Sequence, residues 1–69
     1  MYQVLAFYPN LGIKVRVTEY GSKTEAFEYC GALRLCETPY LMHRNGNVLD
    51  FATYDLTREK MAAMIEEYL

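Results

Sequence analysis

Few side chains in this sequence could carry out chemistry, and they are not spaced as a catalytic set. His43 is the only histidine among 69 residues, so any mechanism that uses an imidazole must use it. If a hairpin joins their two strands, Asp50 is the diagonal neighbour of His43 on the same sheet face. No nucleophile accompanies them, because Cys30 and Cys36 are predicted in a helix and at its exit, and Ser22 is predicted to cap that helix. We therefore expect no catalytic residues and no enzyme activity.

Metal and phosphate sites are not indicated either. Five residues separate Cys30 from Cys36 and six separate Cys36 from His43. These spacings match no zinc-binding pattern, and a fourth soft ligand is missing. Residues 20–24 contain one glycine before a predicted helix, without the spaced glycines of a phosphate-binding loop. We expect no metal and no cofactor, and both cysteines are predicted to be reduced.

The charge balance does not indicate a partner that is bound mainly by electrostatic attraction. Nine acidic and seven basic residues give a net charge of −2, and 52% of the chain is hydrophobic. This weak charge does not provide the broad basic surface that binds duplex nucleic acid, and the apolar fraction argues against disorder. The start of the chain does not resemble a signal peptide, and its longest apolar run, residues 4–8, is far short of a membrane span. We expect one cytoplasmic domain over residues 1–69 that does not bind membranes.

Two β-strands are predicted in the first part of the chain. Residues 2–8 are apolar at both odd and even positions, which indicates a strand covered on both faces. Residues 9–12 supply a turn, and apolar side chains then alternate with polar ones from Ile13 to Thr18, as in a strand with one solvated face. These strands are expected to form a hairpin.

A helix is predicted over residues 23–35. Ser22 and Glu25 have the spacing of a capping box, in which each side chain binds a backbone N–H at the start of the helix. The helix is expected to end before Pro39, because proline disfavours helical geometry in the residue that precedes it.

A second hairpin is predicted around Asn45-Gly46, the dipeptide that best adopts a type I′ turn. A two-residue turn sets the register, which assigns alternate side chains to opposite faces. One face is expected in the core and contains Tyr40, Met42, Leu49 and Phe51. The other is expected to be outward and contains Leu41, His43, Val48, Asp50 and Ala52.

The last helix is predicted to begin after Thr57 as its N-cap, with Leu56 and Met61 in contact across the helix start. Its buried stripe is expected to contain Met61, Ile65 and Leu69, joined by Met64 and Tyr68. The predicted fold is α+β: a four-stranded antiparallel sheet in the order β-β-α-β-β-α, with both helices packed on one face.

Ser22-Lys23-Thr24-Glu25-Ala26 and Leu41-Met42-His43-Arg44-Asn45-Gly46-Asn47-Val48 resemble a family of small uncharacterised bacterial β-β-α-β-β domains. In that family the helix opens Ser/Thr-x-x-Glu-Ala, and the second hairpin reads apolar-apolar-His-Arg before Asn/Asp-Gly. The resemblance covers residues 22–54. It implies a fold and brings no activity or catalytic residues.

An apolar excess on the sheet face away from the helices is the main indication of function. Leu41, Val48 and Ala52 are expected there, and exposed apolar patches are typical of interaction surfaces. The alternative is that a terminal strand or helix covers this patch, or that the register differs by one residue. We expect a non-enzymatic regulator or inhibitor that binds a protein partner or forms a homodimer, such as an inhibitor of a host protein encoded by a phage or mobile element. The predicted contact residues are Tyr8, Arg16, Tyr20, Leu41, His43, Val48 and Tyr54.

The alternative function is binding of single-stranded nucleic acid. Cations interleaved with aromatic rings on a sheet can neutralise phosphates and stack bases. This alternative would use Lys14, Arg16 and Arg44 with nearby tyrosines.

Overall fold

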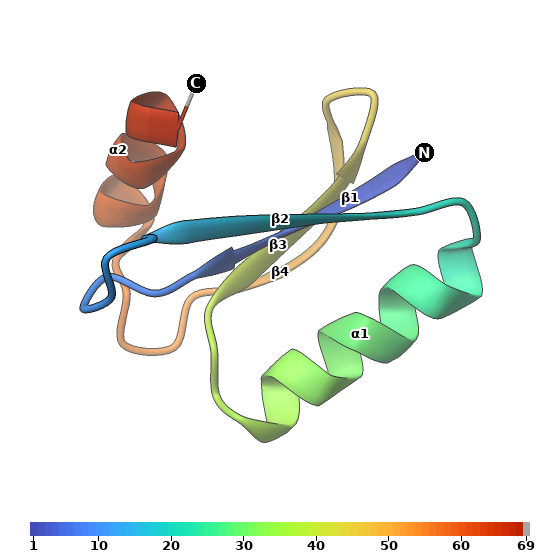
Figure 1. Cartoon of the computed structure of the whole chain (residues 1–69), viewed down its shortest axis with the longest axis horizontal. Helices are drawn as coiled ribbons and strands as arrows, with labels where there is room; N and C mark the ends of the chain where they lie inside the picture. The colour runs from blue at the N-terminus through green and yellow to red at the C-terminus, as the bar shows by residue number, and fades with distance from the viewer. Residues whose placement is uncertain (69) are drawn as a thin grey trace.

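In the computed structural model, which describes residues 1–68, each of two β-hairpins is followed by a helix (Figure 1). The elements are β1 (Tyr2–Phe7), β2 (Val15–Tyr20), α1 (Lys23–Leu35), β3 (Tyr40–Arg44), β4 (Asn47–Ala52) and α2 (Arg58–Tyr68). The strands form one antiparallel sheet in the order β2-β1-β3-β4, in which β1 and β3 join the two hairpins. The predicted α+β class, element order and four-stranded antiparallel sheet are confirmed.

Strand β1 lies inside the sheet and is buried on both faces. Val4 and Ala6 point to one face, and Leu5 and Phe7 point to the other. None of these four side chains is more than 5% exposed. The continuous apolar run in the sequence therefore predicted correctly that both faces of this strand are covered, because successive side chains of a strand point to opposite faces.

The two helices pack on opposite faces of the sheet (Figure 1), so the prediction that both cover one face is wrong. Helix α1 buries Ala26 and Cys30 on the face of Val4 and Ala6. Helix α2 buries Met61 and Met64 against Leu5 and Phe7. Because β1 is apolar on both faces, a helix on each face buries side chains that would otherwise remain in water, each contributing about 2 kcal/mol.

Helix α1 has the predicted bounds, and both of its ends are capped. The Ser22 Oγ accepts a hydrogen bond from the Glu25 N–H at 3.5 Å. At the other end, the Thr38 N–H donates to the Leu33 carbonyl at 2.9 Å, and Glu37 adopts a φ of +51°. This is a Schellman ending, in which a left-handed residue lets the backbone satisfy the last carbonyls and leave the helix.

Replacement of Gly31 by alanine is expected to raise the free energy of unfolding by about 1 kcal/mol. Gly31 lies inside α1, and a Cβ at this position would meet no atom within 4 Å. Alanine therefore removes the conformational cost of a helical glycine without a clash. Urea unfolding would measure the change. Gly46→Ala is the matched control and should destabilise the fold, because Gly46 has a φ of +84°; a destabilising Gly31→Ala would contradict the prediction.

The second hairpin turns at Asn45-Gly46 as predicted. Both residues have positive φ, +51° and +84°, as a type I′ turn requires. Arg44 is paired with Asn47 on either side of the turn, which confirms the start of the predicted register.

One extra residue, Leu49, interrupts β4 and displaces the pairs beyond it by one residue. Met42 lies opposite Asp50 and Leu41 lies opposite Phe51, whereas the predicted partners were Leu49 and Asp50. A shift of one residue moves each side chain to the other face. The prediction that Leu49 and Phe51 are in the core is therefore wrong: these side chains are 43% and 44% exposed.

Helix α2 begins as predicted. The Thr57 Oγ1 accepts a hydrogen bond from the Lys60 N–H at 3.1 Å, and Leu56 and Met61 are both buried. Met64 is also buried, and Ile65 packs against the same cluster. Leu69, the last residue of the predicted stripe, lies outside the described residues.

Candidate functional site

The predicted contact residues are divided between the two faces of the molecule. Residues paired across a sheet share a face, so the strand register assigns each of them. Leu41, His43 and Val48 lie together on the face that α2 partly covers. The other four lie on the side of α1: Tyr8, Arg16, Tyr20 and Tyr54.

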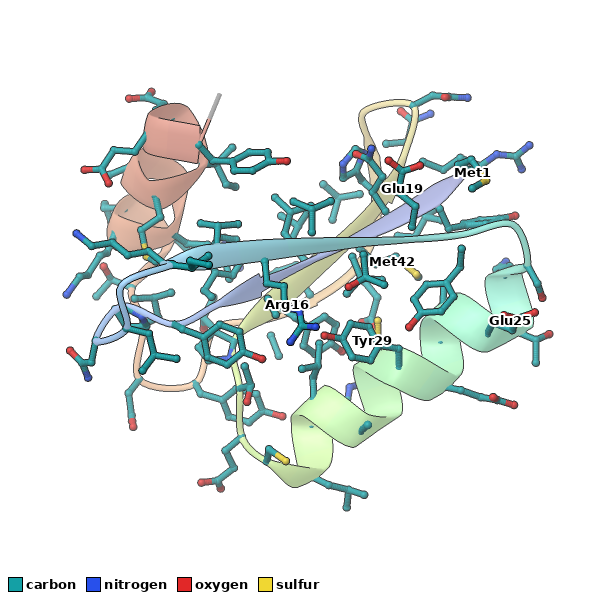
Figure 2. All side chains as sticks on the ribbon, viewed as in Figure 1. Met1, Arg16, Glu19, Glu25, Tyr29 and Met42 are labelled. Atoms are coloured by element: carbon teal, nitrogen blue, oxygen red, sulfur yellow. The ribbon has the colours of Figure 1, made fainter. Side chains whose placement is uncertain are left out.

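The tyrosines on the α1 side take part in packing. The Tyr20 ring lies 5.8 Å from the Tyr29 ring of α1, and the Arg16 side chain extends from β2 towards Tyr29 (Figure 2). Tyr8 and Tyr20 are half-buried against the core, and this burial raises the pKa of both hydroxyls. Tyr20 and Tyr29 join β2 to α1, and the partial burial of Tyr8 and Tyr20 leaves only part of their surface for a partner.

The three predicted nucleic-acid-binding cations do not form one patch. Lys14 and Arg16 lie near one end of the sheet. Arg16 is paired with Ala6 of β1, which is paired in turn with Tyr40 of β3. Arg44 lies four residues further along β3, about 13 Å away. There its guanidinium stacks 5.1 Å from the ring centre of Tyr2 and donates a hydrogen bond to the Tyr2 hydroxyl at 3.2 Å.

His43 and Asp50 point to opposite faces, so the prediction that they share a face is wrong. The cause is the extra residue Leu49, which lies between their pairing positions on β4. His43 instead accepts a weak hydrogen bond on Nδ1 from the Gly46 N–H at 3.4 Å. Asp50 therefore cannot orient the imidazole as a catalytic carboxylate would.

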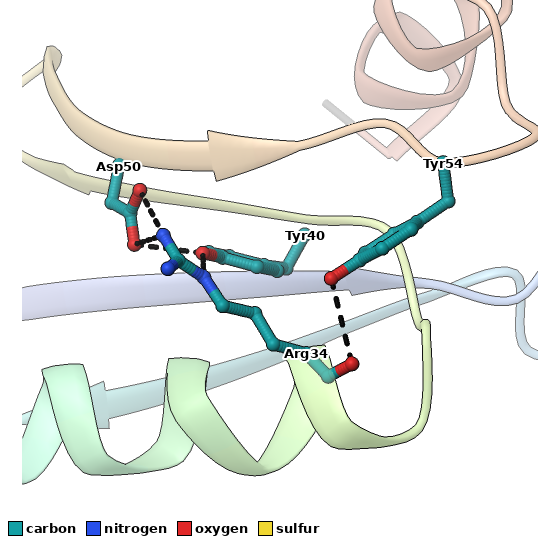
Figure 3. Close-up of polar contacts among 4 residues, drawn as sticks. All are labelled: Arg34, Tyr40, Asp50 and Tyr54. Atoms are coloured by element: carbon teal, nitrogen blue, oxygen red, sulfur yellow. Dashed lines mark hydrogen bonds and ion pairs between the residues drawn. The ribbon is translucent and has the colours of Figure 1, made fainter.

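Asp50 belongs to a polar cluster between α1 and the second hairpin (Figure 3). The buried Tyr40 hydroxyl donates to Asp50 Oδ2 at 2.7 Å and accepts a hydrogen bond from Arg34 Nε at 2.6 Å. Arg34 Nη2 donates to both Asp50 oxygens, at 2.9 and 3.0 Å. The Tyr54 hydroxyl donates to the Arg34 carbonyl at 3.5 Å. The cluster connects the last turn of α1 to β3, β4 and the segment after β4.

Two groups near this cluster remain protonated at neutral pH. Burial raises the pKa of the Tyr40 hydroxyl to about 12, and its hydrogen bond to Asp50 acts in the same direction. Burial also raises the pKa of the Cys30 thiol to about 11, with a further contribution from the negative charge of Asp50. Since a cysteine must be a thiolate to act as a nucleophile, Cys30 is suited to packing. Cys30 and Cys36 are both free thiols.

The free energy of unfolding is expected to fall as the pH rises from about 9 to 12. Unfolded Cys30 and Tyr40 lose their protons near pH 9.0 and 10.0, but the folded chain holds them until about 11 and 12. Stability is therefore full below the unfolded pKa values and is lost as the pH rises through the folded ones. Urea unfolding between pH 8 and 11.5 would measure the slope. Cys30→Ala should flatten the part between pH 9 and 11, whereas Cys36→Ala, at an exposed site, should not; equal slopes for all three proteins would contradict the assignment.

An apolar groove lies between α2 and the second hairpin. Two adjoining hollows of about 310 and 320 Å³ share Leu41, Val48 and Ile65 in their linings, and Phe51 and Ala62 line the second. Val48 is 53% exposed and Phe51 is 44% exposed. These five residues are called the α2 groove. They form an apolar surface that is shared by the two hollows.

Three of the five residues of the α2 groove could not be assigned to it from the sequence. Leu41 and Val48 were predicted on the outward face, and Ile65 was predicted only in the buried stripe of the last helix. Phe51 was placed on the wrong face because no residue pattern near Leu49 indicates a bulge. Arg58, whose guanidinium stacks 5.4 Å from the centre of the Phe51 ring at the edge of the groove, was not predicted.

Within residues 1–68, the structure brings together no three His, Cys, Asp or Glu side chains that could hold a metal ion. No helix in this part of the chain has the length and apolar character needed to cross a membrane. Comparison of the chain with models of known families, with curated proteins and with solved structures found no match. The resemblance to small bacterial β-β-α-β-β domains therefore stays a prediction.

Proposed function

We propose that this chain is a non-enzymatic protein-interaction module, which regulates or inhibits a partner protein by binding it in the α2 groove. The observation that carries the proposal is the continuity of this groove, whose two hollows are joined by Leu41, Val48 and Ile65. Contiguous apolar surface of this kind is typical of binding sites for other proteins.

The arrangement of charged and apolar groups supports binding over catalysis. The pKa values of Tyr40 and Cys30 are raised mainly by burial, which holds both groups neutral inside the fold. At the α2 groove, by contrast, Val48 and Phe51 are exposed and Arg58 stacks on the Phe51 ring. An apolar centre with an arginine at its rim is the composition expected of an interaction surface.

Val48→Glu is expected to abolish partner binding while leaving the fold intact. Val48 is 53% exposed, so a charge there meets water in the free protein but would lose that water in a complex. Immobilised wild type and variant would be compared for the proteins that they retain from an extract of the expressing cells. Ile13→Glu is the matched control, since Ile13 is a β-branched residue, 76% exposed, outside the α2 groove.

The expected result is a protein retained by wild type and Ile13→Glu and lost from Val48→Glu. Urea unfolding should show that neither substitution changes the free energy of unfolding by more than about 0.5–1 kcal/mol, as is usual at exposed positions. Retention of the same proteins by all three forms would refute the groove as the binding site.

A further inference from the structure

The uncovered part of the sheet has the width of one helix. Neighbouring strands lie about 4.8 Å apart and a helix with its side chains is about 10 Å across, so one helix covers about two strands. The cluster in which α2 packs includes Leu5 and Phe7 of β1, Val15 and Val17 of β2, and Leu41 of β3. On the same face, β3 and β4 are left with Leu41, Val48 and Phe51 along the groove.

The shape of β4 disfavours an extended partner. A peptide that adds to a sheet needs a regular edge strand to continue the ladder of hydrogen bonds. β4 is an edge strand, but the extra residue Leu49 interrupts it, and a bulge at an edge is a common protection against such pairing. A helix makes no backbone hydrogen bonds to the sheet and requires only the apolar surface.

Two basic side chains line the two hollows. They are Arg58 at the start of α2 and His43 near the hairpin turn, and no carboxylate among residues 1–68 lines either hollow. Arg58 stacks on Phe51 and lies in the first turn of α2, where a cation is unfavourable to the helix dipole. A carboxylate on the partner would therefore complement both the side chain and the helix end.

Helix α2 of a second copy does not supply such a helix. The outer side of α2 carries Glu59, Lys60, Glu66 and Glu67, all exposed. The apolar side holds Met61 and Met64 against its own sheet. α2 of a second copy could present an apolar stripe to the groove only by leaving its own core.

We propose that the occupant of the α2 groove is an amphipathic helix of another protein, packed beside α2 over β3 and β4, with an apolar stripe and a carboxylate that pairs with Arg58. This inference rests on the proposed function, because it names the kind of partner that the same groove accepts. The sequence of the partner helix is expected to have apolar residues at positions i, i+3 or i+4, and i+7.

A display library of random 16-residue peptides would test the inference. Such a peptide spans about 24 Å as a helix, within the 26 Å of the middle dimension of the molecule. Peptides would be selected on wild type and counter-selected on Val48→Glu. Selected peptides are expected to show helical spacing of apolar residues with Asp or Glu, and to gain helicity on binding, measured by far-ultraviolet circular dichroism.

Point substitutions would locate the contacts. Val48→Glu and Arg58→Glu should each weaken a selected peptide by about tenfold or more, whereas Arg58→Lys should weaken it less and Ile13→Glu should leave it unchanged. Selected peptides with alternating apolar residues and no helicity would show that the partner is extended. This result would overturn the inference of a helical partner but would leave the α2 groove as a binding site. Failure to select any Val48-dependent peptide would overturn the proposed function as well. A homodimer that Val48→Glu dissociates, detected by sedimentation, would overturn the inference in favour of a second copy.

Discussion

Truncation of Phe7 to alanine is expected to lower the free energy of unfolding by about 3–5 kcal/mol, the usual range for a buried phenylalanine. Phe7 is 1% exposed and lies in the cluster through which α2 packs on the sheet. Its partners Leu56, Met61 and Met64 come from the end of the chain, so the cavity would open between β1 and the last helix. A domain of 69 residues has a total stability of roughly 3–10 kcal/mol, so this loss removes at least about a third of it.

Urea unfolding followed by circular dichroism would measure the loss, and Phe51→Ala provides the matched control. Phe51 is the same residue type on the same face of the sheet, but it is 44% exposed and stacks only on Arg58. Its truncation should lower the free energy of unfolding by less than about 1 kcal/mol. An equally small effect of Phe7→Ala would mean that α2 is not anchored through Phe7 and that this face of the sheet is open.

The elements of this fold could be predicted because local signals indicate each of them. The capping side chains of Ser22 and Thr57 and the turn at Asn45-Gly46 act over a few residues, and the structure contains all three. The side of the sheet on which each helix packs is not a local property. It depends on which face of β1 remains exposed to water once α1 has packed against Val4 and Ala6. The sequence contained this information in the apolar residues on both faces of β1.

The candidate site was less predictable because it depends on one inserted residue. Leu49 is an ordinary strand residue, and no glycine or proline beside it indicates a bulge. The bulge exchanges the faces of Asp50 and Phe51, which removes Asp50 from His43 and adds Phe51 to the α2 groove. Val48 precedes the bulge and was therefore placed correctly beside His43. Prediction of the groove from the sequence succeeded up to the residue at which the register changes.

Replacement of Asp50 by alanine is expected to lower the free energy of unfolding by about 2 kcal/mol, the range for hydrogen bonds to charged groups. The substitution leaves the Tyr40 hydroxyl without its acceptor in the core and removes the carboxylate that holds Arg34. The ion pair itself contributes little, because the Arg34 side chain is 56% exposed. Most of the effect should therefore come from the buried Tyr40 hydroxyl, and Arg34→Ala should be milder than Asp50→Ala.

A double-mutant cycle with Tyr40→Phe would separate these contributions. Tyr40→Phe removes the hydroxyl and keeps the ring, so Asp50→Ala should do about 1 kcal/mol less harm in that background than in wild type. His43→Ala is the control, because Asp50 and His43 point to opposite faces of the sheet and their effects should add. If Asp50 instead couples to His43 and not to Tyr40, β4 has the regular register without the bulge. Phe51 would then lie in the core, and the α2 groove would lose the aromatic ring on which Arg58 stacks. The cycle thus tests the feature of the fold on which the proposed interaction surface depends.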